Sequence, residues 1–406
     1  MQLHQEQNRF DLWVNQYRYL NDLNDYLWFI LIIILGFYLI DLLIQKLKIN
    51  KILGHFINFY HVTFTFFVVR YAEKFAHDGN SIFAFAKGHP KAQFITDNIL
   101  YYKGSELLGL LLIPFAQYLN LSIINISLIF SFISSTALLF FLDIIIKINP
   151  KNKVNLLVGL IIILLPTLNF FTTGITKECL SITIFTFVLW NILNNKLNQN
   201  KIIILSVIVF LMFLRPYMGA ILLFFLTLSF LISNKSMKKK KLYNIAFFPI
   251  ITVMVVLGIF MLRDSLHFEQ YSLETVNNFI LNRQQLTMVG FHYNIIDTDY
   301  ISRFFIYIFG PLTLKTNSLF EIFLVFENLL IFSLFLMIIY VLLNNKFILP
   351  KLSFNYYAIL FFSIFMIILL SNITANFGII ARNKYNFLFT LWVYLFYINK
   401  NSKFIK

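Results

Sequence analysis

Charged side chains are scarce in this chain, and hydrophobic ones make up most of the rest. Of its 406 residues, 13% are charged and 59% are hydrophobic. One water-soluble core cannot hide that much apolar surface, and several runs approach the roughly 20 apolar residues that span a bilayer. A β-barrel needs alternating strands of about ten residues, whereas runs such as LLVGLIIILLP are continuously apolar. The composition therefore predicts an all-α, polytopic integral membrane protein.

The sequence has little cysteine and lacks the common histidine patterns of metal sites. Cys179 is the only cysteine, which excludes an intrachain disulfide and a cysteine-based metal cluster. The seven histidines form no HExxH or HxxxH array. Asp297 and Asp299 in NIIDTDY have the spacing of a loop metal site, but two carboxylates alone are a weak signal. We expect no required cofactor and assign no metal ligand. Binding of a divalent metal ion is left as an open alternative.

No secretory signal peptide is expected, because residues 1–26 are polar and mixed in charge, without a basic start and a short apolar run. The net charge of +15 would suggest nucleic acid in a soluble chain. Here the lysines sit in short connections between apolar runs, as they do in the cytoplasmic loops of membrane proteins. We therefore exclude nucleic acid as a partner and expect membrane lipids instead.

The lysines predict the membrane topology, because they fall in clusters between the apolar runs. If these clusters are cytoplasmic, the chain is a single transmembrane domain over residues 1–406 that crosses the membrane about 11 times. Its N-terminus is then outside and its C-terminus cytoplasmic. The predicted spans are 27–45, 52–76, 122–146, 154–171, 178–195, 202–215, 217–234, 243–262, 319–343, 354–372 and 386–399.

The segments predicted to lie outside are longer than the inner turns. They are a polar N-terminal tail (1–26), a first outer loop (77–121) and a second outer loop (263–318). Both loops mix aromatic and charged residues, which is typical of helices that lie in the membrane interface. We expect the function on this outer side, because long loops held by a rigid scaffold carry most binding and catalytic residues.

Arginine follows a different rule from lysine. Although arginine was not used to place the spans, every arginine falls outside or at an outer helix end. Guanidinium is a planar fork that binds phosphate or carboxylate through two parallel hydrogen bonds, so the asymmetry predicts an outward anionic ligand. The alternative is that the arginines pair with outer acids or contact lipid headgroups. They are Arg9, Arg18, Arg70, Arg215, Arg263, Arg283, Arg303 and Arg382.

Two short outer connections place cations next to the apolar layer. In FLRPYMGA, Pro216 ends one helix and begins the next, which leaves Arg215 at a tight hairpin. A charge so close to the membrane is a functional candidate by default, with snorkelling to the headgroups as the alternative. In ANFGIIARNKYNF, Arg382 and Lys384 have the same character.

Three further residues are candidates for catalysis. Asp78 in AHDGNSIFAF opens the first outer loop, where it can accept a proton or cap the next helix. Lys177 and Glu178 follow NFFTTGIT, where Thr173 or Thr176 can cap a helix and Glu178 suits the positive end of its dipole. Alternatively, Lys177 joins a cationic rim, and Glu178 orients it or acts as a base.

The order of these segments resembles bacterial polysaccharide-assembly membrane proteins, namely Wzy-type and EpsG-type polymerases and the broader GT-C glycosyltransferases. Similar proteins tend to carry a lysine–acid pair in the third landmark below and an Arg-Pro in the fourth. Tyr217 stands where such proteins often have a histidine. The landmarks, over about residues 60–400, are HDGNSIFAF, GSELLGLLLIPFAQYLNLS, LPTLNFFTTGITKECL, LRPYMG and NFGIIARNKYNF.

The resemblance implies a GT-C-like fold in the bacterial cytoplasmic membrane and transfer of a glycan from a polyprenyl phosphate or diphosphate at the outer leaflet. Its partners are then a lipid-linked glycan and, as candidates, polysaccharide export proteins. On this hypothesis Asp78 or Glu178 activates the acceptor hydroxyl. Arg215, Arg382 and Lys177, with Arg303 as a further candidate, hold the carrier diphosphate and stabilise the charge that develops as it leaves. The full set of candidate cation and substrate-binding residues is Lys177, Arg215, Tyr217, Arg283, Arg303, Arg382 and Lys384.

Two other classes of function compete with this hypothesis. A transporter or flippase of an anionic or lipid-linked substrate would use the same outer cations, with Glu327 serving coupling. Such proteins usually show an internal repeat, and no matching halves are visible here. A structural subunit of a larger membrane complex is the third class.

Overall fold

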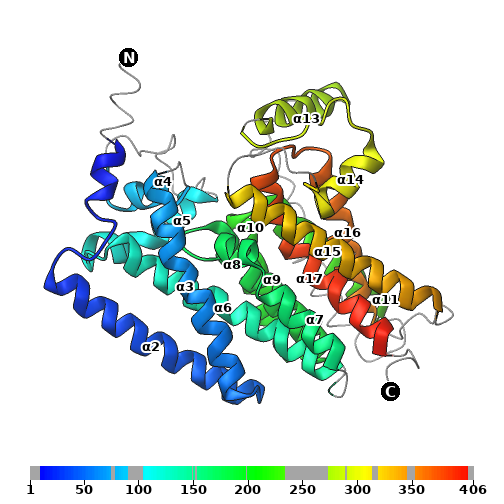
Figure 1. Cartoon of the computed structure of the whole chain (residues 1–406), viewed down its shortest axis with the longest axis horizontal. Helices are drawn as coiled ribbons and strands as arrows, with labels where there is room; N and C mark the ends of the chain where they lie inside the picture. Colours follow the sequence, from blue (N-terminus) through cyan, green and yellow to red (C-terminus); the bar gives the residue numbers. More distant parts are fainter. Residues whose placement is uncertain are drawn as a thin grey trace. The chain divides into compact units, whose positions relative to one another are not determined.

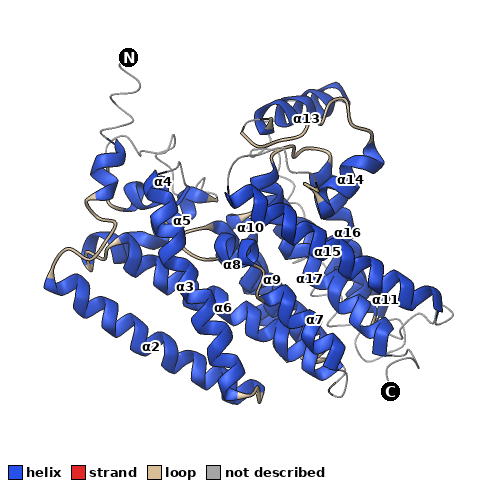
Figure 2. Cartoon of the chain, viewed as in Figure 1, coloured by secondary structure: helices blue, strands red, loops and turns tan. Residues whose placement is uncertain are grey.

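The computed structural model is helical almost throughout the part of the chain that it describes (Figure 1 and Figure 2). Within that part, β-type pairing is limited to an isolated bridge between His292 and Asn376. The described residues are 10–74, 78–89, 104–148, 150, 153–197, 199–233, 273–288, 290–312, 319–344 and 353–400.

The chain divides into two compact units. The first consists of Met1–Asp143 and Ile163–Phe185, and the second of Ile144–Ile162 and Thr186–Lys406. Helices within the first unit are α2 (Leu23–Leu47), α3 (Lys51–Lys74), α4 (Asp78–Ala86), α5 (Ser105–Ile113), the π-helix η3 (Pro114–Tyr118) and α8 (Pro166–Thr172). Residues of both units contribute to α6 (Ile123–Ile148), α7 (Lys153–Ile163) and α9 (Lys177–Leu193). Helices within the second unit are α10 (Lys201–Leu214), α11 (Pro216–Ser233), α13 (Leu273–Thr287), α14 (Tyr300–Phe309), α15 (Leu319–Asn344), α16 (Phe354–Ser371) and α17 (Phe377–Lys400).

The N-terminal segment is part of the first unit's packing from residue 10 onward. Arg18 is only 1% exposed, and its guanidinium donates hydrogen bonds to the Val69 carbonyl at 3.1 Å and the Asn80 amide oxygen at 3.3 Å. The Ile123 N–H at the start of α6 donates to the Tyr17 carbonyl at 2.8 Å. The described end of the predicted tail therefore caps α6, because a helix N-terminus leaves N–H groups that need acceptors.

Buried polar side chains join α3, α6 and α8 inside the first unit. The His61 ring is fully buried between the Asn169 amide oxygen at 2.8 Å and the Ser134 hydroxyl at 2.7 Å. One turn further along α3, Thr65 donates to the Ser131 hydroxyl at 2.7 Å. Polar groups in an apolar interior are costly unless they are hydrogen-bonded, so these pairs fix how the three helices fit together.

The second unit is a bundle in which α11 packs against α10 and α16, and α16 packs against α17. The shorter helix α14 contacts α15, α16 and α17. Hydrogen bonds between these helices include one from the Ser229 hydroxyl to the Asn355 amide oxygen at 2.5 Å and one from the Tyr356 hydroxyl to the Thr390 carbonyl at 2.7 Å.

Several helices are long and apolar enough to cross a membrane, as a multi-pass membrane protein requires. By length and hydropathy they are α2, α3, α6 and α16, with α7 and α8 as a fifth if that bent pair forms one span. Helices lie at ten of the eleven predicted span positions, and the remaining one, 243–262, falls outside the described residues. Because α10 and part of α11 count only as shorter apolar helices, the topology of about 11 spans stays a prediction.

Candidate functional site

The helix break at Arg215 is built as the sequence predicts. Arg215 ends α10, and Pro216 is the first residue of α11, where a missing N–H costs nothing. A Cβ on Gly219 would lie 2.5 Å from the backbone nitrogen of Met212, so only glycine lets α11 come this close to α10. The sequence RPYMG therefore encodes a tight hairpin that fixes the position of Arg215.

The Arg215 side chain is turned into the second unit rather than outward. It is 6% exposed, and its Nη1 donates to the Asn383 amide oxygen at 2.6 Å and to the Tyr217 hydroxyl at 3.4 Å. Asn383 lies on α17, so this bond ties the α10–α11 hairpin to the beginning of the last helix. Arg215 therefore does not snorkel to solvent.

Tyr307 on α14 is an electrostatic neighbour of Arg215 and Tyr217. Its side chain is fully buried, and its hydroxyl has no hydrogen-bond partner in the described structure. Burial raises the pKa of Tyr307 well above its usual value, neighbouring Tyr217 raises it further, and the charge of Arg215 acts in the opposite direction. A buried hydroxyl without a partner is unusual in folded proteins and, beside a cation, indicates a place that a polar ligand can complete.

Arg303 lies one helical turn before Tyr307 on the same face of α14, where Cβ atoms are about 5–6 Å apart. It is 9% exposed, and its guanidinium donates to the Thr298 carbonyl at 2.8 Å and the Asn372 amide oxygen at 3.3 Å. The Tyr300 ring packs 4.9 Å from it. We refer to Arg215, Tyr217, Arg303, Tyr307 and Asn383 as the guanidinium site.

Lys384 and the adjacent Asn383 have different hydrogen-bond partners. Lys384 is 1% exposed, and its ammonium donates to the Asn328 amide oxygen on α15, while the Asn328 amide donates to the Gly310 carbonyl at 2.6 Å. The Glu327 carboxylate acts electrostatically on Lys384 and accepts a hydrogen bond from Tyr385 at 3.2 Å. This buried cluster fastens α15 and the end of α14 onto α17.

The other two predicted cations of the second unit differ from each other in exposure. Arg382 is half-buried on α17, directly before Asn383. Arg283 is exposed on α13, with its guanidinium 5.4 Å from the Phe279 ring centre. Arg215, Arg303 and Arg382 therefore share one end of the second unit, where α10 and α16 end and α11 and α17 begin.

The three predicted catalytic residues belong to the first unit. Lys177 and Glu178 are the first residues of α9, and the Cys179 N–H donates to the Thr176 hydroxyl at 3.3 Å. The structure thus confirms that Thr176 caps this helix. Glu178 is 4% exposed and Lys177 is half-buried, whereas Asp78 is exposed in the first turn of α4.

The acids that suggested a loop metal site have local hydrogen-bonding roles. Asp299 caps α14 by accepting the Ser302 N–H at 2.9 Å, and Asp297 accepts from the Asn294 amide at 2.5 Å. Within the residues that the structure describes, no three His, Cys, Asp or Glu side chains gather so as to hold a metal ion.

Searches against protein-family models, curated proteins and solved structures found no match for this chain.

Sequence analysis named Tyr217 but missed the other two neutral members of the guanidinium site, Asn383 and Tyr307. Asn383 stands between Arg382 and Lys384 in ARNKY, where the two charges drew attention. Tyr307 follows Arg303 at the spacing of one helical turn. A helix over 300–309 therefore places both side chains on one face. Nothing in the sequence pairs either residue with Arg215.

Proposed function

We propose that this protein is a glycosyltransferase of the polysaccharide-assembly type, a polymerase with a GT-C-like arrangement of helices. Its substrate would be a glycan linked to polyprenyl phosphate or diphosphate at the outer face of the bacterial cytoplasmic membrane. The observation that carries the proposal is the guanidinium site, where Arg215 is buried and bonded to Asn383, and where the Tyr307 hydroxyl has no hydrogen-bond partner among the described residues. Guanidinium in a site of low polarity suits phosphate, because it stays charged and offers several donors in one plane.

In this reaction the cations stabilise the leaving phosphate, and a carboxylate accepts the proton of the acceptor hydroxyl. The bond between the anomeric carbon and the carrier phosphate breaks, and its electron pair goes to the phosphate oxygen. The acceptor hydroxyl forms the new bond and gives its proton to a carboxylate. Arg215 and Arg303 would stabilise the negative charge that develops on the leaving phosphate. Asp78 and Glu178, the two bases that the sequence predicts, both belong to the first unit.

A second candidate function is transport of the same class of anion. The observation that favours it is Glu327, a carboxylate that is 3% exposed on α15 and acts on the buried Lys384. Ionisable side chains inside a membrane bundle commonly mark proton or ion pathways. Transport would move the substrate without breaking its glycosidic bond.

Purified protein in detergent, supplied with a polyprenyl diphosphate-linked oligosaccharide, separates the two functions. An enzyme releases free carrier and lengthens the glycan, both of which mass spectrometry measures. Arg215→Ala is expected to lower carrier release at least a hundredfold, and Arg215→Lys by less, because ammonium keeps the charge but loses the planar fork. Arg70→Gln is the matched control, because Arg70 is exposed and paired with Glu73. Unchanged carrier release by Arg215→Ala would remove Arg215 from the site.

A further inference from the structure

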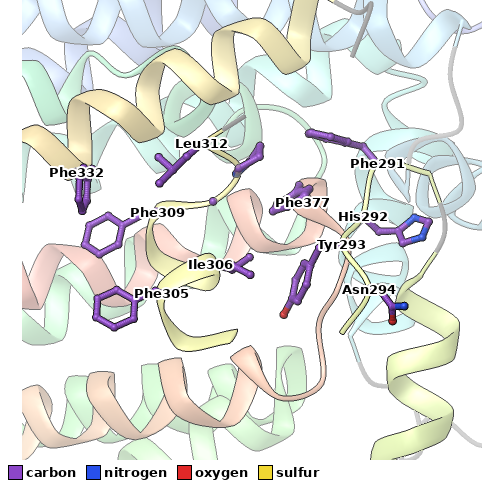
Figure 3. A pocket seen from close by; sticks show the side chains of 12 residues that line it. Phe291, His292, Tyr293, Asn294, Phe305, Ile306, Phe309, Leu312, Phe332 and Phe377 are labelled. Atoms are coloured by element: carbon purple, nitrogen blue, oxygen red, sulfur yellow. The ribbon is translucent and has the colours of Figure 1, made fainter. Parts of the chain in front are cut away.

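An aromatic pocket lies between α14 and the 290–294 segment. Its volume is about 450 Å³, within the roughly 300–1,000 Å³ usual for ligand pockets. Figure 3 shows rings from α14 and α15 at one end and rings from the 290–294 segment and α17 at the other. The rings that line it are Phe291, Tyr293, Phe305, Phe309, Phe332 and Phe377.

The wall of the aromatic pocket formed by the 290–294 segment is held by hydrogen bonds between backbone groups. The Phe377 N–H donates to the Phe291 carbonyl at 2.9 Å, and the Tyr293 N–H donates to the Ala375 carbonyl at 3.3 Å. These bonds fasten the segment to the beginning of α17. The pocket is therefore preformed, so a ligand does not have to open it.

Helix α14, which forms the opposite wall, has its charged face buried and an apolar face exposed. Arg303 is 9% exposed, and Tyr307 is fully buried. By contrast, Tyr300, Ile301 and Phe305 are 74%, 71% and 53% exposed. A surface helix of a water-soluble protein has the reverse arrangement. The 10 residues of α14 extend over only about 15 Å, against about 30 Å for the hydrocarbon core of a bilayer. These features are typical of a helix that lies in the membrane interface with its apolar face toward the acyl chains.

The neighbouring helix α15 also presents apolar side chains outward. Helix α14 packs against α15, and the Phe309 ring centre lies 5.2 Å from that of Phe332. On one face of α15, which is a predicted span, Ile322, Phe326 and Leu329 are 43%, 69% and 44% exposed. Such a face of a spanning helix contacts acyl chains. Lipid that surrounds α15 therefore lies beside α14 as well.

The side chains that line the pocket indicate what the occupant is. The exposed polar residues His292 and Asn294 lie at one end, and the exposed apolar residues Phe305 and Leu312 lie on the α14 side (Figure 3). A phospholipid has the same order, from a polar headgroup to an apolar chain. A sugar would leave its hydroxyl groups without partners against the rings, whereas a hydrocarbon chain would not.

The aromatic pocket and the guanidinium site lie on opposite faces of α14. Phe305 and Phe309 line the pocket, and a period of 3.6 residues places Arg303 and Tyr307 on the other side of the helix. A lipid whose phosphate is bound at Arg215 therefore cannot place the adjoining part of its chain in the pocket. The occupant is a separate molecule, and the surrounding membrane supplies acyl chains at this place.

We propose that the aromatic pocket binds one acyl chain of a phospholipid from the outer leaflet, and that this lipid holds α14 in the membrane interface. Burial of the chain against the rings supplies the affinity. The inference goes beyond glycan transfer and does not depend on it, because any membrane around α14 supplies the ligand. It makes the guanidinium site sensitive to lipid, since α14 also carries Arg303 and Tyr307.

The first test counts the phospholipids that stay bound to the full chain. The protein is reconstituted in nanodiscs of dioleoylphosphatidylcholine, transferred to a mild detergent and measured by native mass spectrometry. Leu312→Trp fills the mouth of the pocket, and Leu329→Trp is the matched control, because Leu329 is exposed on α15 and does not line the pocket. We expect the wild type and Leu329→Trp to retain one phospholipid that Leu312→Trp lacks.

A second measurement locates α14 and uses a conservative change that keeps an aromatic ring. Phe305→Trp places a fluorophore on the exposed apolar face, and His292→Trp places one at the polar end of the pocket. In nanodiscs of phosphatidylcholine brominated on its acyl chains, the emission added by Phe305→Trp is expected to be quenched about twofold or more, and that added by His292→Trp less.

Three results would overturn the inference. The first is equal phospholipid retention by Leu312→Trp and the wild type, and the second is emission from Phe305→Trp that brominated lipid does not quench. The third comes from protein extracted directly from cell membranes, if a polyprenyl phosphate or a second copy of this chain is retained in place of a phospholipid. None of these measurements involves glycan transfer, so they test the pocket whether or not Arg215 binds phosphate.

Discussion

Arg215 donates a hydrogen bond to Asn383 at 2.6 Å, across 168 positions of the chain. The bond is buried, and it joins the α10–α11 hairpin to α17 within the second unit. An amide oxygen orients a guanidinium without neutralising its charge. Asn383 therefore orients the Arg215 guanidinium at the beginning of α17.

Replacing Asn383 by leucine is expected to lower phosphate affinity while leaving the positive charge in place. A hydrogen bond to a charged group contributes about 1.5–3 kcal/mol, so the loss is roughly ten- to a hundredfold if orientation is what matters. Titration of inorganic phosphate measures it. Asn355→Leu, which removes a bond to Ser229 elsewhere in the same unit, is the control. Equal affinity in wild type and Asn383→Leu would show that Arg215 does not depend on this partner.

Replacing Gly310 by alanine is expected to destabilise the protein at the end of α14. A Cβ there would lie 2.6 Å from the Ile306 carbonyl oxygen, and a backbone atom cannot rotate away. Overpacking of this kind costs about 1–3 kcal/mol. Thermal unfolding in detergent measures the change, with Gly378→Ala as control, because the atom nearest to a Cβ there belongs to a side chain, Oδ1 of Asn376 at 3.1 Å. A Gly310→Ala protein as stable as the control would contradict the packing described for α14.

Removing Lys384 alone is expected to harm the protein more than removing it together with Glu327. Lys384→Met removes a cation that acts on the buried Glu327 carboxylate, and a buried charge becomes more costly when a compensating charge is lost. In the double variant Lys384→Met/Glu327→Gln both charges are gone, so much of that loss should be recovered. Thermal unfolding of the four proteins in one detergent gives the coupling. Additive effects would mean that the two charges do not interact.

The cap of α14 makes its first turn sensitive to acid. The hydrogen bond from Ser302 lowers the pKa of Asp299 below its ordinary value of 3.8. Since the folded pKa is the depressed one, the stabilisation is complete above pH 3.8 and is lost as the pH falls through the lower folded value. We expect amide exchange in this turn, divided by the intrinsic rate, to rise only below that pH.

Two variants check the assignment of this acid effect. Asp299→Asn keeps an acceptor for the cap and should give a profile without the acid step. Asp299→Ala should exchange fast at every pH. The first turn of α16 serves as the internal reference, because Ser353 makes no side-chain cap bond there. An acid step that persists in Asp299→Asn would assign it to another group.

Local features of this protein could be read from its sequence, because they depend on neighbouring residues. Apolar runs gave the helix positions, Pro216 gave the break beside Arg215, and Thr176 before Lys177 gave the cap of α9. The apolar runs do not show whether the shorter helices cross a membrane. A run of 14 residues, as in α10, falls between a full span and a buried core helix.

Contacts between residues far apart in the chain could not be predicted from the sequence, for a physical reason. Periodicity tells which face of a helix is apolar, but not which helix covers that face. Arg18 shows this limit, since it lies in a segment predicted to be a polar tail and is nevertheless 1% exposed. The same limit hid the pairing of Arg215 with Asn383 and the approach of Tyr307.

The most direct test of phosphate handling by Arg215 is an electron cryo-microscopy map of the full chain with polyprenyl diphosphate bound. The account predicts phosphate density about 3 Å from the guanidinium nitrogens of Arg215, with the Tyr307 hydroxyl as a further donor. Lipid density elsewhere on the protein, with Arg215 still bound only to protein groups, would contradict it.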